Sequence, residues 1–148
     1  MTDYVLDTNI FNKLLDGIMK WEELPNDGQF FITHIQHKEL NDTPDEMRRA
    51  ELLQTMHLAA PKRVPTESMV WGFFNWGEAK WSDGVIYTQL KTALDALKKQ
   101  KSNASDALIG ELGIVNNYRL ITADRNLSLV VQQAGGKVQF FPAPDASI

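Results

Sequence analysis

Short apolar segments alternate with longer amphipathic segments along the chain, and this alternation constrains the fold more than any other feature of the sequence. Four apolar runs have the length and composition of buried strands: 3–7, 29–32, 118–122 and 137–141. Six segments space their apolar residues as helices do: 9–20, 33–41, 43–60, 85–99, 103–116 and 125–134. Strands that alternate with helices favour a mostly parallel sheet covered on both faces. We therefore expect an α/β fold of three layers, α/β/α, with a central sheet of four to five strands.

Local signals predict where several of these helices begin. The segment THIQ, residues 33–36, fits a capping box in which Thr33 precedes the helix and a glutamine follows three residues on. The segment TPDE, residues 43–46, predicts an N-cap at Thr43 with a proline at the first helical position. The helix over 9–20 is expected to present one apolar face, made of Ile10, Leu14, Leu15 and Ile18.

The length and composition predict one domain that spans residues 1–148, with an aromatic-rich insertion at 64–84 that holds three of the four tryptophans. The absence of cysteine excludes disulfides, thiolate chemistry and cysteine-based zinc sites. No apolar run approaches the length of a membrane span, and we expect a cytoplasmic protein. The formal net charge of −4 argues against a general nucleic-acid binder, but it permits a protein that reaches nucleic acid through bound cations.

Four acidic residues are candidates for one shared site. Asp7 ends the first predicted strand, and Asp124 follows the strand at 118–122. In parallel sheets, ligands bind at the carboxyl ends of the strands. Glu39 lies on the helix that directly follows the second strand, and Asp106 lies in the first turn of the helix at 103–116. The topology therefore places all four acids near the same edge.

Each of these acids also has a purely structural interpretation. Asp7 and Asp124 could be the N-caps of the helices that follow them. Asp106 could answer the positive end of its helix dipole, and Glu39 could be a solvated helix residue. Taken one at a time, these interpretations are the stronger ones, because caps are common. It is the order of the four acids and their surroundings that favour a shared function.

The motifs around the acids resemble those of the PIN-domain nucleases, especially the VapC-type toxins of bacterial toxin–antitoxin pairs. VLDTNIF resembles the first motif of that family, with Asp7 as its acid, and ITHIQHKEL resembles the second, with Glu39. ASDALIGELGIVNNYRLITADRNL resembles the third and fourth, with Asp106 and Asp124. DTN alone is a weak signal, whereas four motifs in the right order are a strong one. The resemblance covers both ends of the chain, and the insertion at 64–84 departs from the shorter connection expected in the family.

The resemblance implies a metal-dependent endoribonuclease that acts as a toxin on RNA, is inhibited by an antitoxin protein and forms a homodimer. Four ionised acids in one cleft repel one another, and a divalent cation removes this conflict. Oxygen ligands without thiols suit Mg²⁺ or Mn²⁺. Asp7, Asp106 and Asp124 are the expected metal ligands, and Glu39 is expected to bind the metal or to orient the attacking water.

Polar neighbours of the acids are candidates for a supporting role. Asn9, two residues after Asp7, and Thr122, two residues before Asp124, could hold the carboxylates in place. For Asn9, a helix-capping role is an equally good interpretation. The basic segments 62–63 and 98–101 could contact the RNA backbone, but short basic runs are more often solvated surface, and we favour that interpretation.

Two other function classes compete with a ribonuclease toxin. A phosphohydrolase with an aspartyl nucleophile fits an aspartate at a strand end, but DTN lacks the second acid two residues on that such enzymes use. A non-toxin RNA-processing protein, or a scaffold that only binds Mg²⁺, would use the same acidic site. Growth arrest on expression and RNA cleavage would separate these alternatives. Neither glycine-rich phosphate loop of the common kinds is present.

Overall fold

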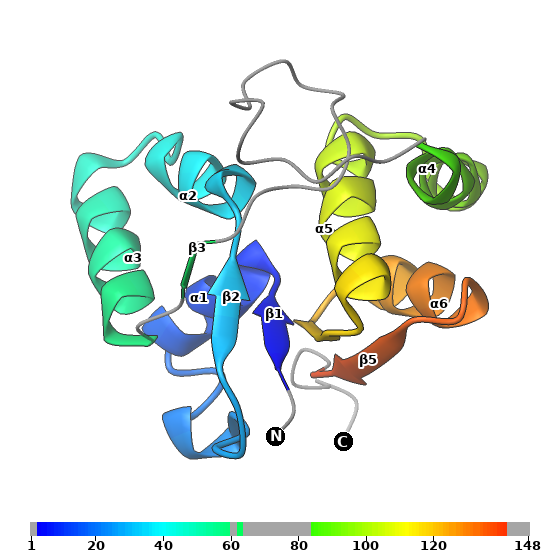
Figure 1. Cartoon of the computed structure of the whole chain (residues 1–148). Helices are drawn as coiled ribbons and strands as arrows, with labels where there is room; N and C mark the ends of the chain where they lie inside the picture. Colours follow the sequence, from blue (N-terminus) through cyan, green and yellow to red (C-terminus); the bar gives the residue numbers. More distant parts are fainter. Residues whose placement is uncertain (1–2, 60–61, 64–83, 142–148) are drawn as a thin grey trace, which may run out of the picture.

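The computed structural model describes residues 3–59, 62–63 and 84–141 (Figure 1). The predicted insertion at 64–84 lies outside the described residues except for Gly84, and the assignment of 1–148 to one domain stays a prediction. The strands are β1 Tyr4–Leu6, β2 Phe30–Ile32, β3 Lys62–Arg63, β4 Arg119–Thr122 and β5 Lys137–Phe140. The helices are α1 Thr8–Leu15, the 3₁₀ turn η1 Trp21–Glu23, α2 His34–Asn41, α3 Glu46–Ala59, α4 Val85–Leu97, α5 Asn103–Asn116 and α6 Arg125–Gln133.

The five strands form one sheet in the order β3-β2-β1-β4-β5, and each neighbouring pair is parallel. Helices α1, α2 and α3 gather beside the β1–β2 half of the sheet, and α4, α5 and α6 pack together beside the β4–β5 half (Figure 1). The predicted α/β fold with a mostly parallel sheet is confirmed. Strand β3 was not predicted, because two residues carry no period of their own and owe their extended form to pairing with β2.

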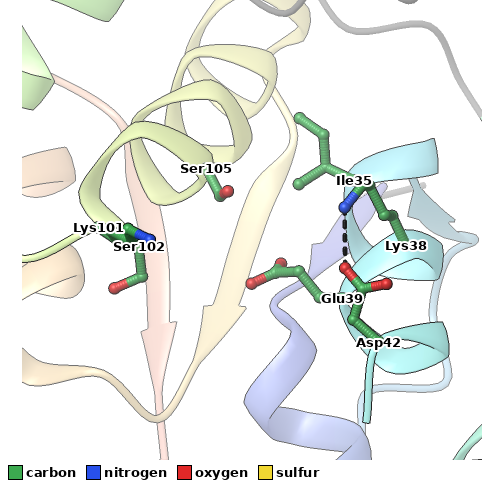
Figure 2. Close-up of a pocket in the computed structure, with 7 residues that line it drawn as sticks. All are labelled: Ile35, Lys38, Glu39, Asp42, Lys101, Ser102 and Ser105. Carbon is green, nitrogen blue, oxygen red and sulfur yellow. Dashed lines mark hydrogen bonds and ion pairs between the residues drawn. The ribbon is translucent and has the colours of Figure 1, made fainter.

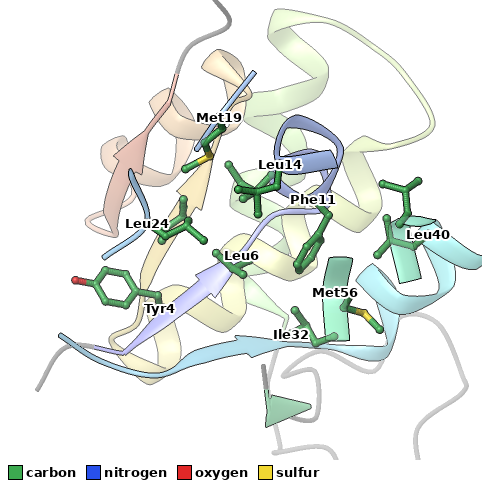
Figure 3. Packing of buried hydrophobic residues seen from close by; sticks show 12 residues of the cluster. Tyr4, Leu6, Phe11, Leu14, Met19, Leu24, Ile32, Leu40 and Met56 are labelled. Atoms are coloured by element: carbon green, nitrogen blue, oxygen red, sulfur yellow. The ribbon is translucent and has the colours of Figure 1, made fainter. Parts of the chain in front are cut away.

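The central strand β1 is buried on both faces. Tyr4 and Leu6 belong to one apolar cluster with α1 and α3, and Figure 3 shows Leu6 beside Phe11 and Tyr4 on the side of Leu24. Val5 points to the other face and belongs to a second cluster, which is built mainly on α4, α5 and α6. Successive side chains of a strand point to opposite faces, so a short strand with no polar residue must be covered on both. Packing on both faces fixes the position of β1 in the core. It therefore also fixes the position of Asp7, which directly follows β1.

Two predicted helix boundaries are wrong. The first helix ends at Leu15 rather than residue 20, because Gly17 adopts φ +73° and turns the chain; Ile18, expected on the buried face, is 45% exposed. The third helix begins at Glu46, where Asp45 Oδ1 accepts hydrogen bonds from the amides of Met47 and Arg48. Asp45 therefore has the capping role that was predicted for Thr43.

The predicted capping box at 33–36 is confirmed. Thr33 accepts a hydrogen bond from the amide of Ile35, and Gln36 Oε1 accepts one from the amide of Thr33 and another from its hydroxyl. The entry into α2 is therefore fixed directly after β2. No helix in the described ranges is long and apolar enough to cross a membrane.

Candidate active site

Asp7 and Asp124 meet at the carboxyl edge of the sheet because β1 and β4 are adjacent and parallel. The amide of Asp7 donates to the carbonyl of Ile121 at 2.9 Å, which continues the strand pairing past Leu6. Thr122 joins the two acids: its hydroxyl donates to Asp7 Oδ2 at 2.7 Å and accepts from the amide of Asp124 at 3.0 Å. Thr122 is fully buried, so its hydrogen bonds to Asp7 and Asp124 are shielded from water.

Both aspartates are also helix caps, as their structural interpretation predicted. Asp7 Oδ1 accepts from the amide of Thr8 at 2.8 Å. Asp124 Oδ1 accepts from the amides of Asn126 and Leu127 at 2.9 and 3.2 Å. For Asp124, the second oxygen accepts no hydrogen bond from the part of the chain that the structure describes. Capping therefore orients this carboxylate and leaves one oxygen for a ligand.

Glu39 is tied to the same edge through Thr8. The Thr8 hydroxyl donates to Glu39 Oε1 at 2.8 Å, while the Thr8 amide contacts Asp7. Helix α2 is held in place by Gln36, whose Nε2 donates to the carbonyl of Leu6 at 3.0 Å from a fully buried position. Glu39 is therefore half-buried and hydrogen-bonded, which contradicts its interpretation as a solvated helix residue.

Asp106 approaches from α5 and is only 7% exposed. The hydrogen bonds within the described part of the chain engage the side chains of Asp7, Glu39 and Asp124, but none of them engages that of Asp106. A buried carboxylate without hydrogen-bond donors is unfavourable as an anion. This arrangement is what a site that receives a cation would need.

The four acids interact electrostatically. Burial, followed by the charges of Asp7, Asp124 and Glu39, raises the pKa of Asp106 to about 9. Burial is also the largest cause that raises the pKa of Glu39 to about 7, and the charge of Asp7 adds to it. Burial raises the pKa of Asp7 to about 6, against hydrogen bonds from Thr122 and Thr8 that lower it. Without a counter-ion, full ionisation of the four carboxyl groups is therefore unfavourable near neutral pH.

The polar candidates Asn9 and Thr122 both touch this cluster. Asn9 Oδ1 accepts from the amide of Ala123 at 3.2 Å, and the nearby Asn9 side chain lowers the pKa of Asp7. The cap of α1 is Asp7, so the capping role considered for Asn9 is not the one observed. The sequence did not predict two contacts of this site: the hydrogen bond from Thr8 to Glu39 and the one by which Gln36 anchors α2. These contacts reach 31 and 30 residues along the chain, and no local signal reports them.

A cavity of about 450 Å³ opens beside Glu39, between α2 and the start of α5 (Figure 2). Of the four acids, only Glu39 lines it, so the cavity adjoins the cluster rather than containing it. Among the residues that the structure describes, those that line it are Ile35, Lys38, Glu39, Asp42, Lys101, Ser102 and Ser105.

The donor set fits a hard divalent cation that retains water ligands. Among the described residues, no three acidic or histidine side chains form a ready-made coordination group. Mg²⁺ does not require one, because it commonly binds through one or two carboxylates and keeps several waters. The Asp106 carboxylate, which has no donor in the described part of the chain, and the second oxygen of Asp124 are suitable ligands. The mutual repulsion of the acids is the property that a cation would relieve.

Comparison with known proteins shows the fold. No family model and no curated protein matches the chain. A domain of a functionally unknown protein from Methanocaldococcus jannaschii is similar in structure, with 15% identity, a TM-score of 0.55 and coverage of 100% of this chain and 96% of that one. A member of the VapBC family of toxin–antitoxin systems, VapBC-5 from Mycobacterium tuberculosis, matches with 17% identity and a TM-score of 0.54, covering 97% of this chain and all of that one. The chain thus shares the α/β fold of a toxin–antitoxin protein.

Proposed function

We propose that the protein is a divalent-metal-dependent endoribonuclease that hydrolyses RNA phosphodiester bonds. The observation that carries the proposal is the convergence of Asp7, Glu39, Asp106 and Asp124, from four different elements, at the carboxyl edge of the sheet. Structural caps explain two of these acids. They do not explain why Asp106 is buried beside three others with no hydrogen-bond donor among residues 3–59, 62–63 and 84–141.

The four carboxylates have different roles in this proposal. Asp7, Asp106 and Asp124 would hold Mg²⁺ or Mn²⁺, directly or through its water ligands, while Thr122 and Asn9 keep Asp7 in position. The bound cation supplies charge neutralisation at the phosphate and lowers the pKa of the attacking water. Glu39, whose pKa is raised to about 7, is suited to accept the proton of that water. Thr8 keeps one oxygen of Glu39 engaged and leaves the other for this task.

We further propose that the protein is the toxin of a type II toxin–antitoxin pair, with an antitoxin protein as its inhibitor. The similarity in fold to a VapBC-family structure supports this assignment. The partner is expected to place a basic side chain among the acids, because a cation is what the cluster lacks. Homodimerisation remains an expectation from the family resemblance.

The test is hydrolysis of a labelled RNA by the purified protein with Mn²⁺ or Mg²⁺. Asp7→Asn and Asp106→Asn should each lower the rate by at least about 100-fold, the upper range for residues that only support a metal ligand. Asp16→Asn is the matched control, because Asp16 lies at the other end of α1 and is exposed. Equal activity of wild type and Asp7→Asn would assign the cleavage to a contaminant or to another site, and it would overturn the proposal.

Expression without an antitoxin separates the toxin from its alternatives. Wild-type protein should arrest bacterial growth, and Asp106→Asn should relieve the arrest. Cleavage in vitro combined with harmless expression would favour an RNA-processing role. A protein that binds Mg²⁺ but cleaves no RNA would be a scaffold.

A further inference from the structure

The cavity beside Glu39 has an anion-binding side. Lys101 and Ser102 line it where α5 begins (Figure 2), and the N-terminus of this 14-residue helix carries a partial positive charge. Ser102 is the N-cap residue, yet its hydroxyl makes no capping hydrogen bond. This hydroxyl is therefore available to a ligand in the cavity.

The two lysines of the cavity differ in their partners. Lys38 forms an ion pair with Asp42 at 2.8 Å, which neutralises it (Figure 2). Lys101 is exposed and pairs with no acidic side chain of the described residues. Of the two lysines that are described in the cavity, the one without an acidic partner thus lies on the α5 side, next to Ser102 in the sequence.

The opposite wall comes from α2 and carries the apolar residue Ile35 beside the Lys38–Asp42 ion pair and Glu39. Ile35, which is only 2% exposed, presents hydrocarbon from α2. Glu39 lies one turn further along α2, extends into the space between the helices (Figure 2) and is joined to Asp7 through Thr8. A ligand in this cavity would therefore bring an anionic group to Lys101 and an apolar surface to Ile35, with Glu39 beside it.

We infer that this cavity holds the nucleotide adjacent to the scissile phosphate of single-stranded RNA, with its backbone phosphate on Lys101 and Ser102 and its ribose or base against Ile35. A volume of about 450 Å³ lies in the range of sites that accept small organic ligands. The inference rests on the proposed nuclease function and adds to it the residues that bind the substrate.

The sequence alone favoured solvated surface for the whole basic segment 98–101. The structure separates its members, because Lys101 lines the cavity and Lys98 does not. Lys98 is exposed and immediately follows α4. The segment therefore provides its own control: Lys98→Gln removes the same charge as Lys101→Gln from the same stretch of chain.

The experiment measures binding of a fluorescein-labelled single-stranded RNA by fluorescence anisotropy in Mg²⁺ at several salt concentrations. Asp7→Asn is used as the background so that hydrolysis does not consume the probe. Removal of one phosphate contact to a single strand reduces the slope of log Kd against log salt by about 0.7, which corresponds to about fivefold weaker binding near 0.1 M salt. We expect this change for Lys101→Gln and no change for Lys98→Gln.

A second variant tests the cavity without changing the charge. Ser102→Trp should fill it and weaken RNA binding, and the absence of a capping bond from Ser102 makes the substitution tolerable for the fold. The melting temperature checks that each variant is folded.

The outcomes separate this inference from the nuclease proposal. If RNA binding depends on Lys101 but the wild type does not cleave the RNA, the cavity is an RNA-binding site and the proposed nuclease function is wrong. If the wild type cleaves RNA but Lys101→Gln and Lys98→Gln bind it equally well, the cavity does not bind RNA, and the nuclease function is unaffected.

Discussion

Thr8 is the residue on which two of the four acids depend. Its amide donates to Asp7 Oδ1, and its hydroxyl donates to Glu39 Oε1, so one residue sets the position of the Asp7 carboxylate relative to that of Glu39. Partners that orient catalytic carboxylates commonly matter almost as much as the carboxylates themselves. The hydroxyl contact can be removed without touching the backbone contact.

We predict that Thr8→Val lowers the RNA cleavage rate by about 10-fold to 100-fold, because valine keeps the shape of threonine but cannot donate to Glu39. Thr8→Ser keeps the hydroxyl and should retain most of the activity. The pH–rate profile distinguishes positioning from packing. Glu39 must lose its proton to act as the base, and loss of the Thr8 donor raises its pKa, so the acid-side limb of the profile should move to higher pH. Equal rates for the valine and serine variants would contradict this role.

The docking of α2 on the sheet depends on one buried amide. Gln36 donates from Nε2 to the carbonyl of Leu6 and accepts at Oε1 from Thr33, so the same side chain closes the capping box and fixes the helix against β1. A buried polar group that loses its partner destabilises the protein by about 1–3 kcal/mol. Glu39 lies one turn further on, so its position depends on this anchor.

We predict that Gln36→Leu lowers the free energy of unfolding by about 1–3 kcal/mol, because it leaves the carbonyl of Leu6 without its donor. Urea denaturation measures this change. The variant should also cleave RNA more slowly at temperatures where it is fully folded. Gln132→Leu on α6 is the control: Gln132 is exposed, and its replacement should change stability by no more than about 0.5 kcal/mol.

The capping box at Thr33 was predictable from sequence because all its members lie within four residues. Strand β3 and the end of α1 were not, since the first is stabilised by a neighbouring strand and the second by the turn at Gly17. For the site, the four acids could be named from their places after strands and on helices. The contacts of Thr8 and Gln36 could not, because each joins parts of the chain that only folding brings together.

At the scale of the whole molecule, the acidic cluster opposes folding when no cation is bound. Burial of the side chain is the main cause that raises the pKa of Asp7, Glu39 and Asp106 above their ordinary values of 3.8, 4.5 and 3.8. The folded protein therefore holds these protons more tightly than the unfolded chain does. The resulting stability is present in full below the unfolded values and is lost as pH rises.

We predict that in EDTA the melting temperature falls as pH rises from about 4 toward 9, the window between the ordinary values and the raised value of Asp106. Asp106→Asn should weaken this dependence and stabilise the metal-free protein at pH 8, because it removes the carboxylate that is hardest to ionise. Thermal denaturation followed by circular dichroism measures both effects. A melting temperature that rises steadily with pH in EDTA would contradict the claim that burial raises the pKa values of these acids.

A divalent cation should reverse this trend. At a free Mn²⁺ concentration 100 times its dissociation constant, binding to the folded state adds about 2.7 kcal/mol of stability. The increase in melting temperature should be larger at pH 8 than at pH 6, since carboxylates must be ionised to bind the metal. Asp106→Asn should lose most of this response, and Asp16→Asn should keep it.

The order of the strands also has a consequence during synthesis. The central strand carries Asp7 and is made first, but its neighbour β4 and the acid after it come more than a hundred residues later. A growing polypeptide that has not reached residue 124 cannot assemble the four carboxylates. If the protein cleaves RNA, this topology keeps it harmless to the ribosome and transcript that produce it until β4 and Asp124 have been made and have paired with β1.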